Sequence, residues 1–323
     1  MTRMLRLAIL TSVATYLLIV VGAYVRVTGS GMGCPDWPRC YGELVPDLNV
    51  AVNRPMVIEV AHRYGASVVS LLVGALLVTA LVAYRRNPAV LRPAVAAAAL
   101  LMLQVILGGV TVLTGNAPWT VTAHLATSMA LLAAAIITAV GAHVTAPRRA
   151  RSSDRAASTV TEGFALLAAA TTIAVYLLLL TGAIVRGEGA GLACKGWPLC
   201  NGAVFPAGDR LADIHSFHRL FTVATGVLVG VFVWQSVRRP RPPAIRAWAV
   251  IAGVLFAAQV MVGAVQVWSN LSQDTRLSHV AAGAAVWAAL VVATALALVA
   301  ARRARLARTP TAAPSRRRGR RPA

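Results

Sequence analysis

The sequence Glu-Val-Ala-His-Arg at residues 59–63 stands at the start of a long apolar run, and His-Ser-Phe-His-Arg at residues 215–219 stands at the start of another. In each segment two polar side chains are three residues apart, so a helix places them on one face. Ionisable groups at the mouth of a membrane helix are energetically costly and are usually functional. We therefore interpret the chain as a scaffold that places these two segments, with two partner histidines, at one depth in a membrane.

The composition predicts a polytopic membrane protein. Of the 323 residues, 58% are hydrophobic, and the mean hydropathy of +0.70 is far above that of a soluble domain. The long apolar runs predict helices, since barrel strands would be half as long and would alternate in polarity. No small-residue cleavage site follows the first run, so we expect a retained helix and not a removed signal peptide. The eight predicted spans are residues 7–26, 57–83, 91–113, 119–142, 162–185, 213–237, 246–268 and 277–301.

The net charge of +21 would suit a nucleic-acid-binding protein, but its distribution argues against nucleic acid as a partner. Arginines cluster in every second connection and at both ends of the chain, whereas the other loops hold most of the acids. This alternation predicts a multi-pass protein of the bacterial cell membrane with both termini in the cytoplasm. The loops at residues 27–56, 114–118, 186–212 and 269–276 are then outside. For the Arg-rich tail we favour a topogenic role over binding to anionic lipid.

The four cysteines all lie in two of the predicted outer loops. Cys34 and Cys40 are in the first large loop, and Cys194 and Cys200 are in the second. An oxidising exterior permits disulfides. Zinc is the rival interpretation, but the spacing differs from that of a zinc finger and neither loop contains a histidine. We favour one disulfide within each loop.

The chain contains an internal repeat. Residues 22–42 match residues 182–202 at an offset of 160, and residues 59–63 match residues 215–219 at an offset of 156. Gln104, Gly108 and His124 match Gln259, Gly263 and His279 at an offset of 155. Four spans return the chain to the same side of the membrane, so the repeat is parallel. The predicted fold is all-α and integral to the membrane, with eight transmembrane helices as two tandem pseudo-symmetric four-helix bundles.

The repeat divides the chain into four parts. The N-terminal four-helix unit is expected at residues 1–146 and the C-terminal unit at residues 162–301. A cytoplasmic linker at residues 147–161 joins them, and a disordered basic tail follows at residues 302–323.

Four of the six histidines occupy matched places in the repeat. They are His62, His124, His218 and His279, at the outer ends of the even-numbered spans. Two histidines on facing helices of a bundle are typical of the axial pair of a haem iron. A structural zinc or copper ion would need a third or fourth ligand close by. A lone histidine is more often a hydrogen-bonded packing residue, but four at matched depth favour iron ligation.

Two arginines follow the motif histidines directly. Arg63 and Arg219 lie where a guanidinium could pair with a haem propionate. For Arg63, an ion pair with Glu59 at i, i+4 is an equally weighted alternative. Arg26 and Arg186 end odd-numbered spans and either meet propionates or extend to the interface.

The two halves differ at one informative position. Glu59 of the first half is replaced by His215 in the second. A carboxyl on the same helical face as an iron ligand can move a proton or position a reactive oxygen species. We expect the first half to hold a haem that is chemically altered, and the second to hold a haem that passes electrons. The glycine- and tryptophan-rich outer loops are expected to cover both sites.

Together these residues resemble haem A synthase in its bacterial form with a cysteine pair in each large outer loop. The resemblance rests on the 59–63 segment, the duplicated four-helix unit, the four histidines and the paired cysteines, and it covers residues 5–301. It implies an eight-helix membrane oxidoreductase that converts the C8 methyl group of haem O to the formyl group of haem A, the cofactor of terminal oxidases.

The resemblance also implies roles for single residues. His62 and His124 would bracket the substrate haem, with Glu59 as the catalytic carboxyl. His218 and His279 would ligate a haem b, and the first cysteine pair would take part in function. The implied partners are haem O synthase, which is a prenyltransferase, assembly factors of terminal oxidases, an electron donor and a second copy of the chain in a homo-oligomer.

Two other functions remain open from the residues. A non-catalytic membrane di-haem cytochrome b would share the histidine pairs but would not need Glu59. A membrane thiol–disulfide oxidoreductase would use the cysteine pairs but would leave the four histidines unexplained.

Overall fold

Eight long helices form the structure, a computed structural model that describes residues 2–44, 46–47, 53–146, 159–206 and 208–308. The N-terminal unit contains α1 (Arg3–Val27), α2 (Arg54–Ala83), α3 (Pro88–Leu113) and α4 (Pro118–Thr145). The C-terminal unit contains α6 (Glu162–Gly187), α7 (Arg210–Arg238), α8 (Pro243–Trp268) and α9 (Gln273–Arg308). All eight are long and apolar enough to cross a membrane, which confirms the prediction of eight spanning helices.

The observed helix ends have local causes. The side chains of Asn53, Asn87 and Asp209 accept hydrogen bonds from backbone N–H groups in the first turns of α2, α3 and α7. Such caps satisfy donors that have no partner within the helix. α9 continues to Arg308, past the boundary predicted at residue 301, because hydropathy marks the apolar span and not the polar turns beyond it. Most of the predicted linker and the tail beyond residue 308 lie outside the described residues.

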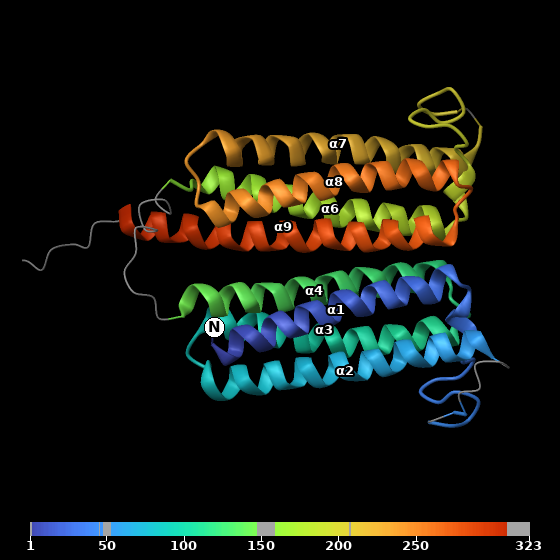
Figure 1. Ribbon diagram of the computed structural model, residues 1–323, viewed down its shortest axis with the longest axis horizontal. Helices are drawn as coiled ribbons and strands as arrows, with labels where there is room; N and C mark the ends of the chain where they lie inside the picture. The colour runs from blue at the N-terminus through green and yellow to red at the C-terminus, as the bar shows by residue number, and fades with distance from the viewer. Residues whose placement is uncertain (1, 45, 48–52, 147–158, 207, 309–323) are drawn as a thin grey trace, which may run out of the picture.

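The two four-helix units lie side by side, and α4 and α9 face each other between them (Figure 1). In the most apolar 18-residue stretch, 61% of α4 and 67% of α9 is buried inside the protein, compared with 17% for α3. One apolar cluster crosses the boundary and includes Leu132 of α4, Phe164 of α6 and Leu290 of α9. The helices at the centre are therefore shielded from lipid, and the two units form one packed body.

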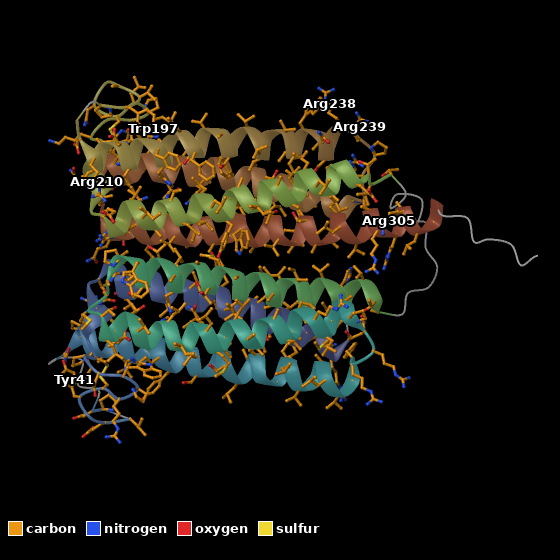
Figure 2. All side chains as sticks on the ribbon, turned by 180° about the vertical axis from the view of Figure 1, so that it is seen from behind. Tyr41, Trp197, Arg210, Arg238, Arg239 and Arg305 are labelled. Atoms are coloured by element: carbon orange, nitrogen blue, oxygen red, sulfur yellow. A yellow bond between two sulfur atoms is a disulfide. The ribbon has the colours of Figure 1, made fainter. Side chains whose placement is uncertain are left out.

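The two ends of the bundle differ in character. Tyr41, Trp197 and Arg210 lie at the end that carries both large loops, whereas Arg238, Arg239 and Arg305 lie at the opposite end (Figure 2). This segregation agrees with the charge alternation of the sequence. That the basic end faces the cytoplasm remains a prediction.

A reciprocal pair of hydrogen bonds joins the two units. Tyr16 of α1 donates its hydroxyl to the carbonyl of Ala281 in α9 at 3.1 Å, and Tyr176 of α6 donates to the carbonyl of Ala126 in α4 at 3.0 Å. Both donors and both acceptors are related by the internal repeat. Each acceptor lies two residues after a predicted ligand histidine, so each bond fixes the depth of a histidine-bearing helix relative to the first helix of the other unit.

A further contact reinforces this boundary on one side. Trp287 of α9 donates its indole N–H to the carbonyl of Met129 in α4 at 2.8 Å, and its ring centroid lies 5.2 Å from that of Tyr176. The repeat places Leu132 at the corresponding position of α4, so this contact has no counterpart. Polar groups that bond across helices are effective in lipid because few alternative partners are available.

We expect Tyr176→Phe to lower the free energy of unfolding by about 0.6 kcal/mol, a typical value for a hydrogen bond between membrane helices. Tyr16→Phe should have a similar effect, and the double variant should be close to additive. Reversible unfolding in mixed micelles measures these changes. Tyr64→Phe, at a ring that is 42% exposed, is the matched control. Stabilities equal to that of the control would contradict the structural role of the pair.

Candidate functional site

Each of the four predicted ligand histidines packs against a glycine of a neighbouring helix. A Cβ atom placed on the glycine would approach the imidazole Cε1 more closely than an ordinary van der Waals contact. The glycines therefore leave the space that the rings occupy. The pairs and distances are Gly22 to His62 at 3.1 Å, Gly108 to His124 at 3.3 Å, Gly182 to His218 at 3.2 Å and Gly263 to His279 at 3.2 Å.

These glycines were visible in the sequence as repeat partners, but their role was not predicted. Gly22 matches Gly182 and Gly108 matches Gly263. The signal that could have revealed it is that the repeat preserves a glycine on the helix next to each histidine.

The histidines of each unit form a pair. His62 and His124 lie close enough to interact electrostatically, and so do His218 and His279. The Nδ1 atoms of His62, His124 and His279 are buried and have no hydrogen-bond partner in the described part of the chain. Buried polar atoms without partners are uncommon and call for an explanation such as a bound group.

The donor set fits a haem in each unit better than a protein-ligated metal ion. No three or more His, Cys, Asp or Glu side chains converge within the described ranges. Two histidines suffice for an iron that brings four equatorial nitrogens, but not for a zinc or copper site. The space that the glycines leave for the four rings agrees with this fit.

A glutamine accompanies the second histidine of each pair, and its contact differs between the units. The Nε2 atoms of Gln104 and His124 are 3.0 Å apart. Gln259 instead donates to the backbone carbonyl of His279 at 2.9 Å. The imidazole Nε2 of His124 is therefore engaged, whereas that of His279 is not bonded to its glutamine.

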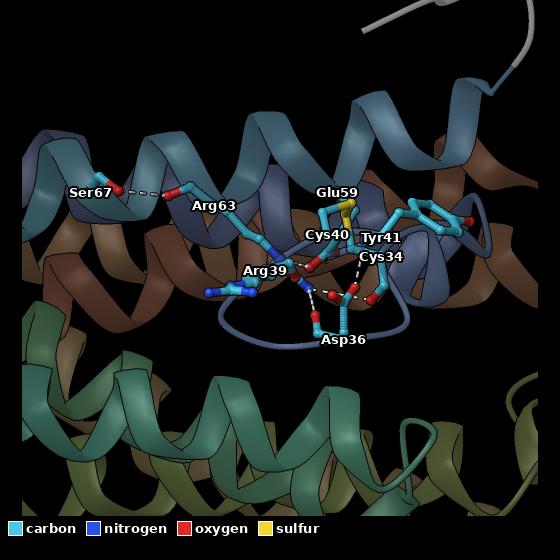
Figure 3. A network of polar contacts seen from close by, with 8 residues as sticks. All are labelled: Cys34, Asp36, Arg39, Cys40, Tyr41, Glu59, Arg63 and Ser67. Carbon is cyan, nitrogen blue, oxygen red and sulfur yellow. Dashed lines mark hydrogen bonds and ion pairs between the residues drawn. A yellow bond between two sulfur atoms is a disulfide. The ribbon is translucent and has the colours of Figure 1, made fainter. Parts of the chain in front are cut away.

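Glu59 is buried at the start of α2 and forms an ion pair with Arg63, whose Nε is 3.0 Å from its Oε1. The remaining guanidinium nitrogens of Arg63 donate to the backbone carbonyls of Cys34, Asp36 and Arg39 in the first loop (Figure 3). The Glu59–Arg63 pairing considered from the sequence is therefore present. The structure directs Arg63 toward the loop, and its pairing with a propionate remains a prediction.

Arg219 performs the same task in the second unit. Its Nη1 donates to the carbonyls of Gly196, Pro198 and Leu199, and its Nη2 donates to that of Cys194. Each arginine thus fastens a large loop to the helix that carries the first histidine of its unit.

The two large loops contain the predicted disulfides, Cys34–Cys40 and Cys194–Cys200. Cys34 and Cys40 pack against Met56 and Val60 in the first turns of α2. Trp37 lies over Gly109 of α3, next to the glycine that faces His124, and Trp197 meets Trp268 edge to face at 6.1 Å. Each loop therefore packs on helix ends of its own unit, and its cover over a haem site remains a prediction.

Asp36 stabilises the tip of the first loop. Its carboxylate accepts the backbone N–H groups of Gly42 and Tyr41, which hold the pKa of this carboxyl below its ordinary value. Because this pKa is lowered, the ionised Asp36 carboxylate stabilises the fold at neutral pH, and this stabilisation is lost as the pH falls through the pKa of the folded state. In the second loop Asn201 is bonded instead to Lys195 and Ala193.

The position of Glu59 is taken in the second unit by a buried histidine. Nδ1 of His215 lies 3.0 Å from the carbonyl oxygen of Ala190 in the loop. The second unit therefore has no carboxylate at the position of α7 that matches Glu59, and the histidine there contacts the loop backbone.

Comparison with known proteins places these features in one family. The sequence profile of a family described as cytochrome oxidase assembly protein matches residues 5–291. A heme A synthase of Symbiobacterium thermophilum is 32% identical over 292 residues, which cover 88% of this chain and 93% of that protein. A heme A synthase of Alkalihalophilus pseudofirmus is 30% identical over 285 residues, which cover 84% of this chain and 90% of that protein.

We expect Gly182→Val to displace the His218 ring and to lower the amount of haem bound by the purified protein. The added atoms would overlap the ring edge, whereas Gly230→Val introduces a side chain where nothing lies within 4 Å. The ratio of Soret to protein absorbance measures haem content. Equal haem content in the two variants would contradict the packing role assigned to the glycine.

Proposed function

This chain belongs to the family of cytochrome oxidase assembly proteins, and we propose that it is a haem A synthase, a membrane oxidoreductase that converts the C8 methyl group of haem O to a formyl group. The relatives of that name match along most of both chains. The observation that carries the proposal is the inequality of two otherwise matched units. The first has a buried carboxylate one turn before its histidine, and the second has a histidine there.

In this proposal the N-terminal unit binds the substrate. His62 and His124 hold haem O, and the glycines against their rings leave the space in which the two imidazoles lie. The loop that carries Trp37 covers this unit, because Arg63 fastens it and the indole packs on α3. Covering the site limits the access of water to the oxidising chemistry.

Glu59 is proposed to move protons during the oxidation. Arg63 holds its Oε1, whereas Oε2 accepts no hydrogen bond from the described residues. A carboxylate fixed at one oxygen and free at the other can accept a proton without a change in position. Two successive hydroxylations turn the methyl group into a geminal diol, which loses water to give the aldehyde. Each is a two-electron oxidation of the carbon that requires an oxygen donor and an external electron carrier.

The C-terminal unit is proposed to hold a resident haem b between His218 and His279. Bound there, the haem would supply one-electron transfer to the first unit. The protein contributes the ligands, the space left by Gly182 and Gly263, and the covering loop fastened by Arg219. The reciprocal tyrosine contacts join α1 to α9 and α6 to α4, and so hold the two units together beside the histidine-bearing helices α4 and α9.

The setting of the reaction is part of the same proposal. The chain would lie in the bacterial cell membrane with both termini in the cytoplasm, as the arginine distribution predicts. Haem O synthase would supply the substrate, and assembly factors of terminal oxidases would receive the product. The other proposed partners are an electron donor and a second copy of the chain in a homo-oligomer.

We expect Glu59→Gln to lower the conversion of haem O by about 10²–10⁴-fold, the usual contribution of a positioned acid–base group. The haem b content should be unchanged, because Glu59 lies in the other unit. Co-expression with haem O synthase, followed by extraction of the pigments, measures both. Glu43→Gln changes an exposed carboxylate of the first large loop and is the control.

The same extraction distinguishes the alternatives. Haem O or haem A beside haem b supports a synthase. Haem b alone, unchanged by Glu59→Gln, would show a di-haem cytochrome b, and a colourless protein would exclude both and leave the thiol–disulfide oxidoreductase.

A further inference from the structure

The residue that precedes the glycine facing the first histidine of each pair differs between the two units. Thr181 precedes Gly182, the glycine that faces His218, and Val21 precedes Gly22, the glycine that faces His62. The two positions are related by the same offset of 160 residues as the rest of the loop and helix repeat. A polar side chain thus contacts one ligand histidine, and an apolar one of the same shape occupies the repeat-related position in the other unit.

The hydroxyl of Thr181 determines which nitrogen of His218 carries the proton. Oγ1 lies 2.8 Å from Nδ1 of His218 and 2.8 Å from the carbonyl oxygen of Leu178. A hydroxyl has one hydrogen, and the carbonyl can only accept, so that hydrogen points to Leu178. Oγ1 therefore accepts a hydrogen bond from Nδ1–H. This leaves the lone pair of Nε2 available for iron.

His62 is placed in the same way but lacks this partner. A Cβ on Gly22 would lie 3.1, 3.6 and 3.7 Å from Cε1, Nε2 and Nδ1 of His62. The distances from Gly182 to the same atoms of His218 are 3.2, 3.8 and 3.9 Å. Yet Nδ1 of His62 is buried without a hydrogen bond, because Val21 offers no acceptor. Ligation through Nε2 would leave an unpaired Nδ1–H in the protein interior, which is unfavourable.

The second histidine of each pair also differs between the units, and again the histidine of the first unit is the less available to bind iron. Gln104 already occupies Nε2 of His124, and this contact must break before that nitrogen can bind iron. Gln259 is turned to a backbone carbonyl and leaves Nε2 of His279 free of such competition. Both histidines of the first unit are therefore weaker ligands than their counterparts in the second.

We propose that the Thr181/Val21 difference determines which haem the protein retains and which it releases. This inference rests on the proposed function, in which one haem is a substrate that leaves as product and the other is resident. Thr181 acts as a positioning residue that strengthens His218 as a ligand. Val21 is a specificity-determining residue, because the missing acceptor keeps the first unit from trapping its product. An outer partner of a ligand histidine typically changes metal affinity by about 10–100-fold.

The test uses reciprocal exchanges in the full-length purified protein, co-expressed with haem O synthase. Thr181→Val removes the acceptor, and Thr181→Ser keeps it. Val21→Thr introduces an acceptor whose own hydrogen can bond to the carbonyl of Leu18, the repeat partner of Leu178. Val21→Ala is the control without a hydroxyl. Transfer of each haem to an excess of apomyoglobin measures release, and a redox titration measures the midpoint potential of haem b.

We expect Thr181→Val to release haem b about 10–100-fold faster. Its midpoint potential should move to more positive values, because the imidazole loses the acceptor that increases its donation to ferric iron. Thr181→Ser should match the parent protein. Val21→Thr should slow the release of the first unit's haem by about 10–100-fold, and Val21→Ala should not.

An unchanged release rate and potential in Thr181→Val would overturn the proposal, as would unchanged release in Val21→Thr. If Thr181→Val does not yield folded protein, Val21→Thr decides alone. Failure of the proposed function has a different signature: no haem O or haem A is extracted from the parent protein, although the haem b comparisons still give a result.

Discussion

The close approach of a histidine ring to the backbone of a neighbouring helix is the constraint on which the rest of the structure depends. It occurs four times, and each time a glycine supplies the space. A larger residue at any of these positions would force the helix apart from the ring or turn the ring away. The helix pairs α1/α2 and α3/α4, and their repeats α6/α7 and α8/α9, are therefore held at the spacing that the histidines need. The loops, the arginine clamps and the tyrosine contacts preserve that spacing.

Duplication explains how one scaffold can hold two different sites. The repeat preserves the histidines, their glycines, the loop disulfides and the arginine that fastens each loop. It does not preserve all the residues near the histidines, nor every contact of those that it does preserve. Glu59 against His215 changes the acid–base chemistry at the mouth of the unit, Val21 against Thr181 changes the partner of the first ligand, and Gln104 and Gln259 bond differently. In the proposed function, these few differences distinguish a site that converts its haem from a site that retains it.

Much of this architecture could be predicted from the sequence. Hydropathy marks the membrane helices, and the internal repeat allows one half of the sequence to be aligned with the other. The eight spans and both disulfides are confirmed. The four matched histidines occupy equivalent places against glycines, and their role as iron ligands stays a prediction. Side-chain partners could not be predicted, since several options satisfy the same spacing. Arg63 could pair with Glu59, a loop or a propionate, and only the fold shows that it holds the first two. The role of Thr181 also required the fold, because a threonine in an apolar helix usually bonds to its own backbone.

The central claim is that the two units bind different haems through separate histidine pairs. Extraction and identification of pigments from His62→Ala and His218→Ala proteins, each co-expressed with haem O synthase, test it directly. The account predicts that His62→Ala loses haem O and haem A but keeps haem b, and that His218→Ala loses haem b. Loss of haem b from the His62→Ala protein, with haem O or haem A retained, would contradict it.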